Sequence, residues 1–136
     1  MLDRGQELAA YILEEEIGGG GMGIVYRAYD EPLDRMVAVK LIKPELSADP
    51  VFHQRFDRER KAHASLNHAN IVEIYRSGES EHGLYVAMRL IDGPSVGQLL
   101  ESGPLGGGET LRILGPIAEA LDFAHAKGPV HRDLKP

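Results

Sequence analysis

A run of glycines near the start of the 136-residue chain has the spacing of a phosphate-binding loop. Gly18, Gly20 and Gly23, together with Val25, give the pattern Gly-x-Gly-x-x-Gly-x-Val. Because glycine has no Cβ, the backbone of such a run comes close to a ligand and offers its N–H groups to phosphate oxygens. The pattern alone is weakly specific, since dinucleotide-binding folds contain a similar one.

A lysine and a glutamate downstream provide one charge of each sign. Lys40 lies in the alternating apolar run 36–42 and shares a face with Ala38, opposite three aliphatic residues. If a helix covers the aliphatic face, Lys40 points toward the ligand of the glycine run. Glu59 stands in the middle of an apolar stripe of helical spacing, and a lone glutamate at such a position usually reaches solvent. Burying either charge unpaired is unfavourable, so we predict a Lys40–Glu59 ion pair that accommodates both.

The residues after the glycine run distinguish the two kinds of loop. A dinucleotide-binding loop must open a helix, but residues 24–29 are β-branched and aromatic and precede a turn at 30–32. Such a composition predicts a strand, so the glycines lie in a hairpin between strands at 11–17 and about 24–29. A helix follows Asp49, which is a good N-cap residue with Pro50 as the first helical residue.

Asp92-Gly93-Pro94 is the best candidate for a domain boundary in the remainder of the chain. Pro116 is expected to bend the last helix or end its first segment, because proline removes a backbone hydrogen bond. The further strands are expected at 36–42, 71–75 and 84–88, with a turn at 77–83, and the further helices at 95–101 and 109–127.

Composition excludes several classes of protein. The net charge of −6 argues against non-specific nucleic-acid binding and against attachment to an acidic membrane. The absence of cysteine excludes disulfides and fits a reducing cytoplasm. No apolar run approaches the roughly 18 residues of a membrane span, and the first residues do not form a signal peptide. We therefore expect a cytoplasmic protein.

The motifs, in their order along essentially the whole chain, resemble the eukaryotic-like (Hanks-type) serine/threonine protein kinases of bacteria. They are the glycine run, Val37-Ala38-Val39-Lys40, Glu59 and His131-Arg132-Asp133. The resemblance implies an α+β fold, in which residues 1–92 form the kinase N-lobe, a five-stranded antiparallel sheet with one long helix. Residues 93–136 would form the first helices of an incomplete C-lobe and end in the catalytic-loop segment.

The resemblance also implies an ATP site beneath the glycine run. Lys40 would bind the α- and β-phosphates and be held by Glu59, while Ala38 packs against adenine. Met88 would line the back of the adenine pocket, and the hinge after it would bond the adenine edge through backbone groups. Arginine at position 89, where the family usually has glutamate, should be tolerated for that reason. The residues implied in ATP binding are Ile17, Gly18, Gly19, Gly20, Gly21, Met22, Gly23, Ile24, Val25, Ala38, Lys40, Met88, Arg89 and Ile91.

The end of the chain matches a kinase catalytic loop. Asp133 would orient the substrate hydroxyl and accept its proton, and Lys135 would stabilise the transferring phosphate. Arg132 matches the residue that pairs with a phosphorylated activation loop, and His131 packs the site. His63 stands where the family commonly has an apolar residue. The implied cofactors are ATP and Mg²⁺, and the implied partners are proteins that carry serine or threonine.

The 136 residues do not contain every part that the resemblance calls for. They include no magnesium-binding asparagine after the catalytic loop, no Asp-Phe-Gly and no activation segment, and no metal ligands are identified. We expect a truncated kinase domain that has little or no transferase activity by itself, because the charge on the transferring phosphate is not neutralised. The alternative is a non-catalytic ATP-binding or kinase-interaction module, such as an N-lobe that pairs with another kinase. Small-molecule phosphotransferases share the fold, but the run Arg132 to Pro136 favours protein kinases.

Overall fold

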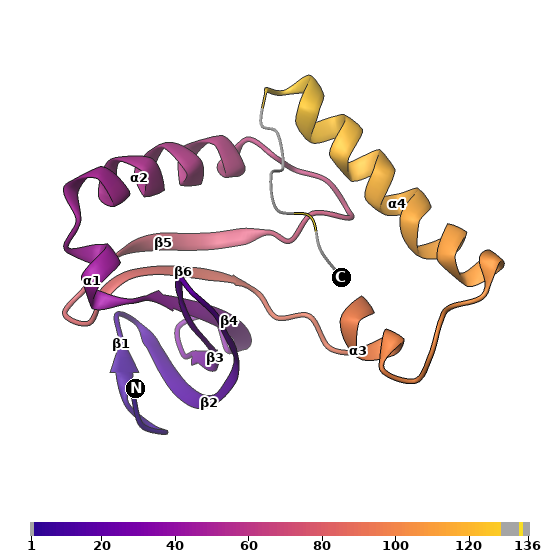
Figure 1. Ribbon diagram of the computed structural model, residues 1–136. Coiled ribbons are helices and arrows are strands. Elements are labelled where there is room, and N and C mark those ends of the chain that lie inside the picture. Colours follow the sequence, from indigo (N-terminus) through magenta and orange to yellow (C-terminus); the bar gives the residue numbers. More distant parts are fainter. Residues whose placement is uncertain (1, 129–133, 135–136) are drawn as a thin grey trace. The chain divides into compact units, whose positions relative to one another are not determined.

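The computed structural model describes residues 2–128 and 134 (Figure 1). The chain divides into two compact units. The first unit comprises Met1–Ala64 and Glu73–Ile91, and the second comprises Ser65–Val72 and Asp92–Pro136. None of the helices within the described residues is both long and apolar enough to span a membrane.

An antiparallel sheet forms most of the first unit, in the strand order β1-β2-β3-β4-β6-β5. The predicted α+β architecture, an antiparallel sheet with one long helix, is confirmed. The sheet has six strands instead of five, because a two-residue strand that no sequence pattern indicates pairs with β2. The strands are β1 (Glu7–Leu8), β2 (Tyr11–Gly19), β3 (Gly23–Asp30), β4 (Arg35–Ile42), β5 (Ile74–Ser80) and β6 (Gly83–Arg89).

The predicted position of β5 is wrong by several residues. The strand was expected at 71–75 and the turn at 77–83, but the strand spans Ile74–Ser80 and the turn is much shorter. The second half of β5 is polar and has the composition of a turn. It is nevertheless a strand, because β5 lies at the edge of the sheet, where polar residues are tolerated. The Ser80 hydroxyl closes the turn by donating to the Gly83 carbonyl at 2.9 Å and accepting the His82 N–H at 3.2 Å.

The two faces of the sheet have different coverings. Val37 and Val39 are fully buried in a core formed by other strands of the sheet itself. The long helix α2 (Pro50–Ala64) covers the opposite face, where Phe56 packs against Ile42 and Leu84. Lys40 was expected to point toward the ligand if a helix covered the aliphatic face. The structure does not meet this condition, because the helix covers the other face. The buried members of the sheet core are Leu8, Tyr11, Leu13, Tyr26, Ala28, Val37, Val39, Tyr85 and Ala87.

The long helix of the first unit is α2 (Pro50–Ala64), and it begins where the sequence predicts. The Asp49 carboxylate accepts the backbone N–H of Val51 at 2.9 Å, which satisfies one of the open donors of the first turn. A short helix, α1 (Pro44–Ser47), precedes it and was not predicted. Figure 1 shows α1 and α2 following β4, with α2 running over β5.

The second unit contains α3 (Val96–Leu100) and α4 (Gly107–Ala126). Ser95 and Gln98 form a capping box at the start of α3. Helix α4 does not end at Pro116 but continues to Ala126. It also exposes apolar side chains: Leu111 is 73% exposed and Leu114 52%.

Candidate nucleotide-binding site

The glycine run forms the turn of the β2–β3 hairpin. Gly18 pairs with Val25 and Gly19 with Ile24 across the hairpin. The N–H of Gly20 donates to the Gly23 carbonyl at 3.0 Å, which closes the tip. The loop therefore leads into a strand, as predicted, and not into the helix that a dinucleotide-binding loop requires.

The glycines of this loop differ in what requires them. A Cβ built on Gly20 or Gly21 would meet no atom within 4 Å, so the fold of the described chain leaves these positions open. A Cβ on Gly23 would overlap the carbonyl oxygen of Leu41 on β4 and lie 2.9 Å from its carbonyl carbon. The strand pairing thus requires Gly23, whereas glycine at 20 and 21 leaves space for a ligand to approach the backbone.

Four of the predicted ATP-binding residues lie on one face of three neighbouring strands. Val25 on β3 pairs with Lys40 on β4, and Lys40 pairs in turn with Val86 on β6. Ala38 pairs with Met88 one step along the same face. Directly opposed residues of antiparallel strands point to the same side, so Val25, Ala38 and Met88 form an apolar surface beside the Lys40 ammonium.

The predicted Lys40–Glu59 ion pair is not formed. Among the described residues no carboxylate lies within 4.0 Å of the Lys40 ammonium. Glu59 is exposed on α2, although Lys40 lies on the sheet face that α2 covers. The cation is consequently available to a ligand phosphate in this conformation.

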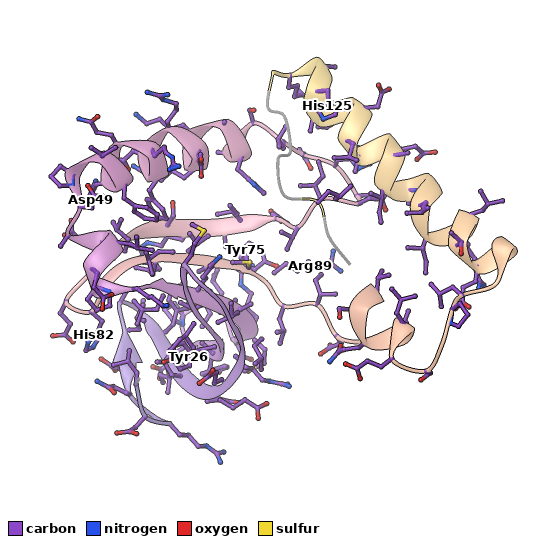
Figure 2. All side chains as sticks on the ribbon, in the orientation of Figure 1. Tyr26, Asp49, Tyr75, His82, Arg89 and His125 are labelled. Carbon is purple, nitrogen blue, oxygen red and sulfur yellow. The ribbon has the colours of Figure 1, made fainter. Side chains whose placement is uncertain are left out.

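The segment after β6 offers backbone groups at the edge of this surface. Arg89, labelled in Figure 2, is the last residue of β6. Its N–H donates to the Glu73 carbonyl at 2.9 Å, which holds the end of the strand. Ile91 is 62% exposed, and its backbone makes no hydrogen bond with another described residue. An open N–H and C=O at this position suit the polar edge of adenine.

The arrangement fits ATP more fully than it fits Mg²⁺. An apolar surface for the base, one lysine and a sterically open glycine loop lie together in the first unit. No group of three or more histidine, aspartate or glutamate side chains in the described residues could hold a metal ion. The predicted catalytic residues Asp133 and Lys135 lie outside the described residues, as do His131 and Arg132.

The pKa values of two tyrosines in the same unit, Tyr11 and Tyr29, are raised by their surroundings. Burial raises the pKa of Tyr11 above its ordinary 10.0, and the negative charge of Asp30 raises it further. Tyr29 is partly exposed, and its hydrogen bond to Asp34, 2.6 Å between oxygens, is the main reason that its pKa is raised. Neither tyrosine belongs to the predicted ATP-binding set.

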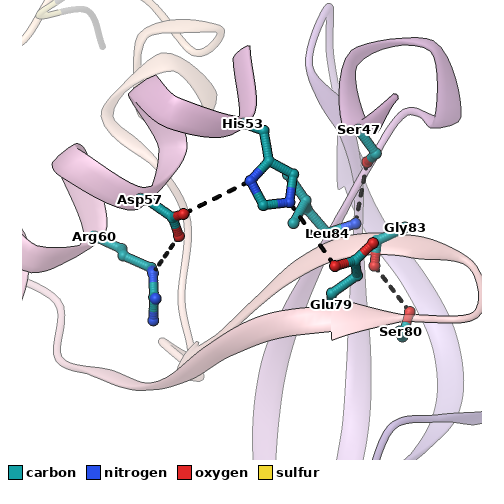
Figure 3. Close-up of polar contacts among 8 residues, drawn as sticks. All are labelled: Ser47, His53, Asp57, Arg60, Glu79, Ser80, Gly83 and Leu84. Carbon is teal, nitrogen blue, oxygen red and sulfur yellow. Dashed lines mark hydrogen bonds and ion pairs between the residues drawn. The ribbon is translucent and has the colours of Figure 1, made fainter. Parts of the chain in front are cut away.

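Sequence reasoning missed a polar cluster that connects α2 to the sheet (Figure 3). His53 lies between Asp57 on its own helix, 3.6 Å away, and Glu79 on β5, 3.8 Å away. Ser47 accepts the Leu84 N–H at 3.0 Å. The i, i+4 spacing of His53 and Asp57 is visible in the sequence, but the contacts with β5 and β6 depend on tertiary structure.

Comparison with known proteins identifies relatives of the chain. A model of the protein kinase domain matches residues 11–136. The serine/threonine-protein kinase PknJ of Mycobacterium tuberculosis is 39% identical over 135 residues, which are 99% of this chain and 23% of PknJ. PknE of the same species is 43% identical over 133 residues, which are 97% of this chain and 24% of PknE. The crystal structure of the M. tuberculosis PknI kinase domain has a TM-score of 0.88 at 35% identity, covering 100% of this chain and 55% of that one.

Proposed function

We propose that this chain, which belongs to the protein kinase domain family, binds ATP and contributes the nucleotide-binding part of a serine/threonine protein kinase. The observation that carries the proposal is the single sheet face on which Val25, Ala38, Lys40 and Met88 meet beside the glycine hairpin. The names of PknJ and PknE support serine and threonine hydroxyls of proteins as the phosphate acceptors.

The chain spans less than a quarter of the length of PknJ and PknE, and 55% of the PknI kinase domain. The phosphotransfer itself is therefore proposed for a kinase that includes these residues. Within it, Asp133 orients the acceptor hydroxyl and takes its proton, and Lys135 stabilises the transferring phosphate. ATP, when bound, supplies the phosphoryl group.

Lys40 is proposed to bind the α- and β-phosphates, and Glu59 to pair with Lys40 once the nucleotide is bound. A lysine that is half-buried beside apolar side chains gains most from charged partners on both sides. The described residues offer no metal cluster, so we assign no step to Mg²⁺. A polypeptide of these 136 residues alone is proposed to have little or no transferase activity, since it contains no Asp-Phe-Gly segment.

The experiment is a titration of the chain with ATP, with Lys40→Met and Lys43→Met as the variants. Lys43 is an exposed lysine just beyond the end of β4, which makes it a matched control for loss of one positive charge. We expect Lys40→Met to weaken ATP binding by about tenfold or more, as loss of a charge-assisted contact does, and Lys43→Met to leave it unchanged. Equal affinity of the Lys40→Met variant and the unchanged chain would refute the assignment.

A further inference from the structure

The first unit contains a cavity at the end of β4, beside the β5–β6 turn. Its volume is about 370 Å³, and sites for small molecules in proteins commonly have volumes of about 300–1,000 Å³. The apolar part of its wall includes Leu2, Ile24, Tyr26 and Leu41. The cavity therefore has the size and the apolar lining of a small-molecule site.

The cavity is separate from the proposed ATP site. Ile24 and Leu41 pair directly across β3 and β4, and both pack against the buried core of the sheet. Their neighbours Val25 and Lys40 are the next pair along the same two strands. Because successive residues of a strand point to opposite faces, the cavity and the Lys40 surface lie on opposite faces of the sheet.

A buried tyrosine hydroxyl gives the cavity a hydrogen-bond donor. Tyr26, labelled in Figure 2, is only 2% exposed, and its Oη accepts the N–H of Leu2 at 3.1 Å. A phenol both accepts and donates, but no described residue accepts the proton of this one. A buried donor without an acceptor is unfavourable. Since Leu2 and Tyr26 both line the cavity, a ligand with an acceptor group satisfies this donor.

The uncompensated charge at the cavity wall is positive. Lys43 is exposed, and no carboxylate of the described residues lies within 4.0 Å of its ammonium. Glu81 also borders the cavity, but its Oε1 lies 3.3 Å from Nε2 of the neighbouring His82. A free ammonium and a free phenol proton together favour an anionic acceptor, because charge-assisted hydrogen bonds are the stronger ones.

We propose that this cavity binds a small aromatic carboxylate. The ring lies among Leu2, Ile24 and Leu41, and the carboxylate accepts the Tyr26 proton and faces the Lys43 ammonium. A rigid aromatic body suits the apolar wall, because it buries a large area without loss of rotamer freedom. The proposal does not depend on ATP binding.

A titration of the 136-residue chain with naphthalene-2-carboxylate tests the proposal, with naphthalene-2-carboxamide as the uncharged probe. Two-dimensional ¹H–¹⁵N spectra locate the ligand, and we expect the amide signals of Ile24, Leu41 and His82 to shift. The carboxamide should bind at least about threefold more weakly than the carboxylate. This difference measures the preference of the cavity for an anion.

Two substitutions test the two polar contacts. Lys43→Met should weaken binding of the carboxylate about threefold and leave binding of the carboxamide unchanged, because the ammonium is exposed to solvent. Tyr26→Phe should weaken binding of the carboxylate about tenfold, because it removes a buried hydrogen bond to a charged group. Lys61→Met, at an exposed lysine of α2, and Lys40→Met, on the opposite sheet face, are the controls and should have no effect.

The contrary outcomes are equally defined. Absence of carboxylate binding, or signal shifts confined to the exposed face of α4 around Leu111 and Leu114, would refute the cavity as the site. Weaker binding in Lys40→Met would place the probe at the nucleotide surface instead. Equal affinity for the two probes would refute the preference for an anion. If Tyr26→Phe does not fold, the Lys43→Met result decides, since that side chain is exposed.

The same variants separate this proposal from the proposed function. Lys43→Met should change carboxylate binding and not ATP binding, whereas Lys40→Met should change ATP binding and not carboxylate binding. A chain that binds the carboxylate but not ATP would refute the proposed function alone. A chain that binds ATP but not the carboxylate would refute this inference alone.

Discussion

The α-carbon of Gly23 lies against the carbonyl group of Leu41, so closely that a side chain at this position would overlap the carbonyl oxygen. Gly23 is buried in β3 and is paired with Ile42, the residue after Leu41. Gly23, the third spaced glycine of the motif, is therefore needed for strand pairing, whereas Gly20 and Gly21 at the tip of the loop are not. Within this one motif, Gly23 serves the fold, and the glycines at the tip are left for ligand binding.

The first prediction uses this difference. Gly23→Ala should lower the free energy of unfolding by about 1–3 kcal/mol, because the methyl group must push apart two paired strands. Gly20→Ala should change the unfolding free energy by less than about 1 kcal/mol, since its Cβ meets no atom within 4 Å, and should weaken ATP binding instead. Urea denaturation and ATP titration of both variants measure the two effects. Equal destabilisation by the two substitutions would contradict the steric argument.

The sequence predicts the middle of the sheet well and its margins poorly. The run 36–42 and the glycine hairpin carry strong alternation and turn signals, so β3 and β4 agree with expectation to within one residue. Strand β1 has only two residues, and Leu8 within it is buried in the core of the sheet, which is a tertiary effect. The short helix α1 likewise depends on the contact between Ser47 and Leu84.

The candidate site divides in the same way. Alternation along β4 is sufficient to predict that Lys40 and Ala38 share a face, whereas the pairing of Val25 with Lys40 depends on the register of the β3–β4 hairpin. The separation of Lys40 from Glu59 was not predictable, because the helical stripe reports which side of α2 is apolar but not how far the helix lies from β4. Distance between elements depends on packing of Phe56 against Ile42 and on the ties at the start of the helix.

The second prediction concerns the anchor of α2. Phe56 is 9% exposed and is the buried residue of the helix, so Phe56→Ala should cost about 3–5 kcal/mol of stability. Val51→Ala, on the same helix at 70% exposure, should change stability by less than about 0.5 kcal/mol. Thermal or urea unfolding checks the pair. A loss for Phe56→Ala that is as small as that for Val51→Ala would mean that α2 is held by its polar contacts alone.

The third prediction follows from the raised pKa of Tyr11. The unfolded chain loses this proton at pH near 10.0, and the folded chain loses it at a higher pH. The contribution of neutral Tyr11 to stability is therefore complete below pH 10 and decreases as the pH rises through the folded pKa. In Tyr11→Phe, the free energy of unfolding should fall less steeply between about pH 9 and pH 11.

Tyr75→Phe controls for the loss of one tyrosine elsewhere in the sheet. Urea unfolding at several alkaline pH values measures both variants against the unchanged chain. An alkaline slope that Tyr11→Phe leaves unchanged would mean that burial of this phenol does not govern the pH dependence.

The last prediction concerns the exposed face of α4. Leu111 and Leu114 are three residues apart on the helix and are 73% and 52% exposed, so they form adjoining apolar surface. The double substitution Leu111→Glu and Leu114→Glu should reduce self-association of the chain, because charged side chains there oppose burial against a second copy. Leu33→Glu, at 62% exposure in the β3–β4 turn, is the matched control in the first unit. Sedimentation velocity over a range of concentrations compares the variants. Equal self-association of the α4 variant and the Leu33→Glu control would mean that another surface of the chain mediates the association.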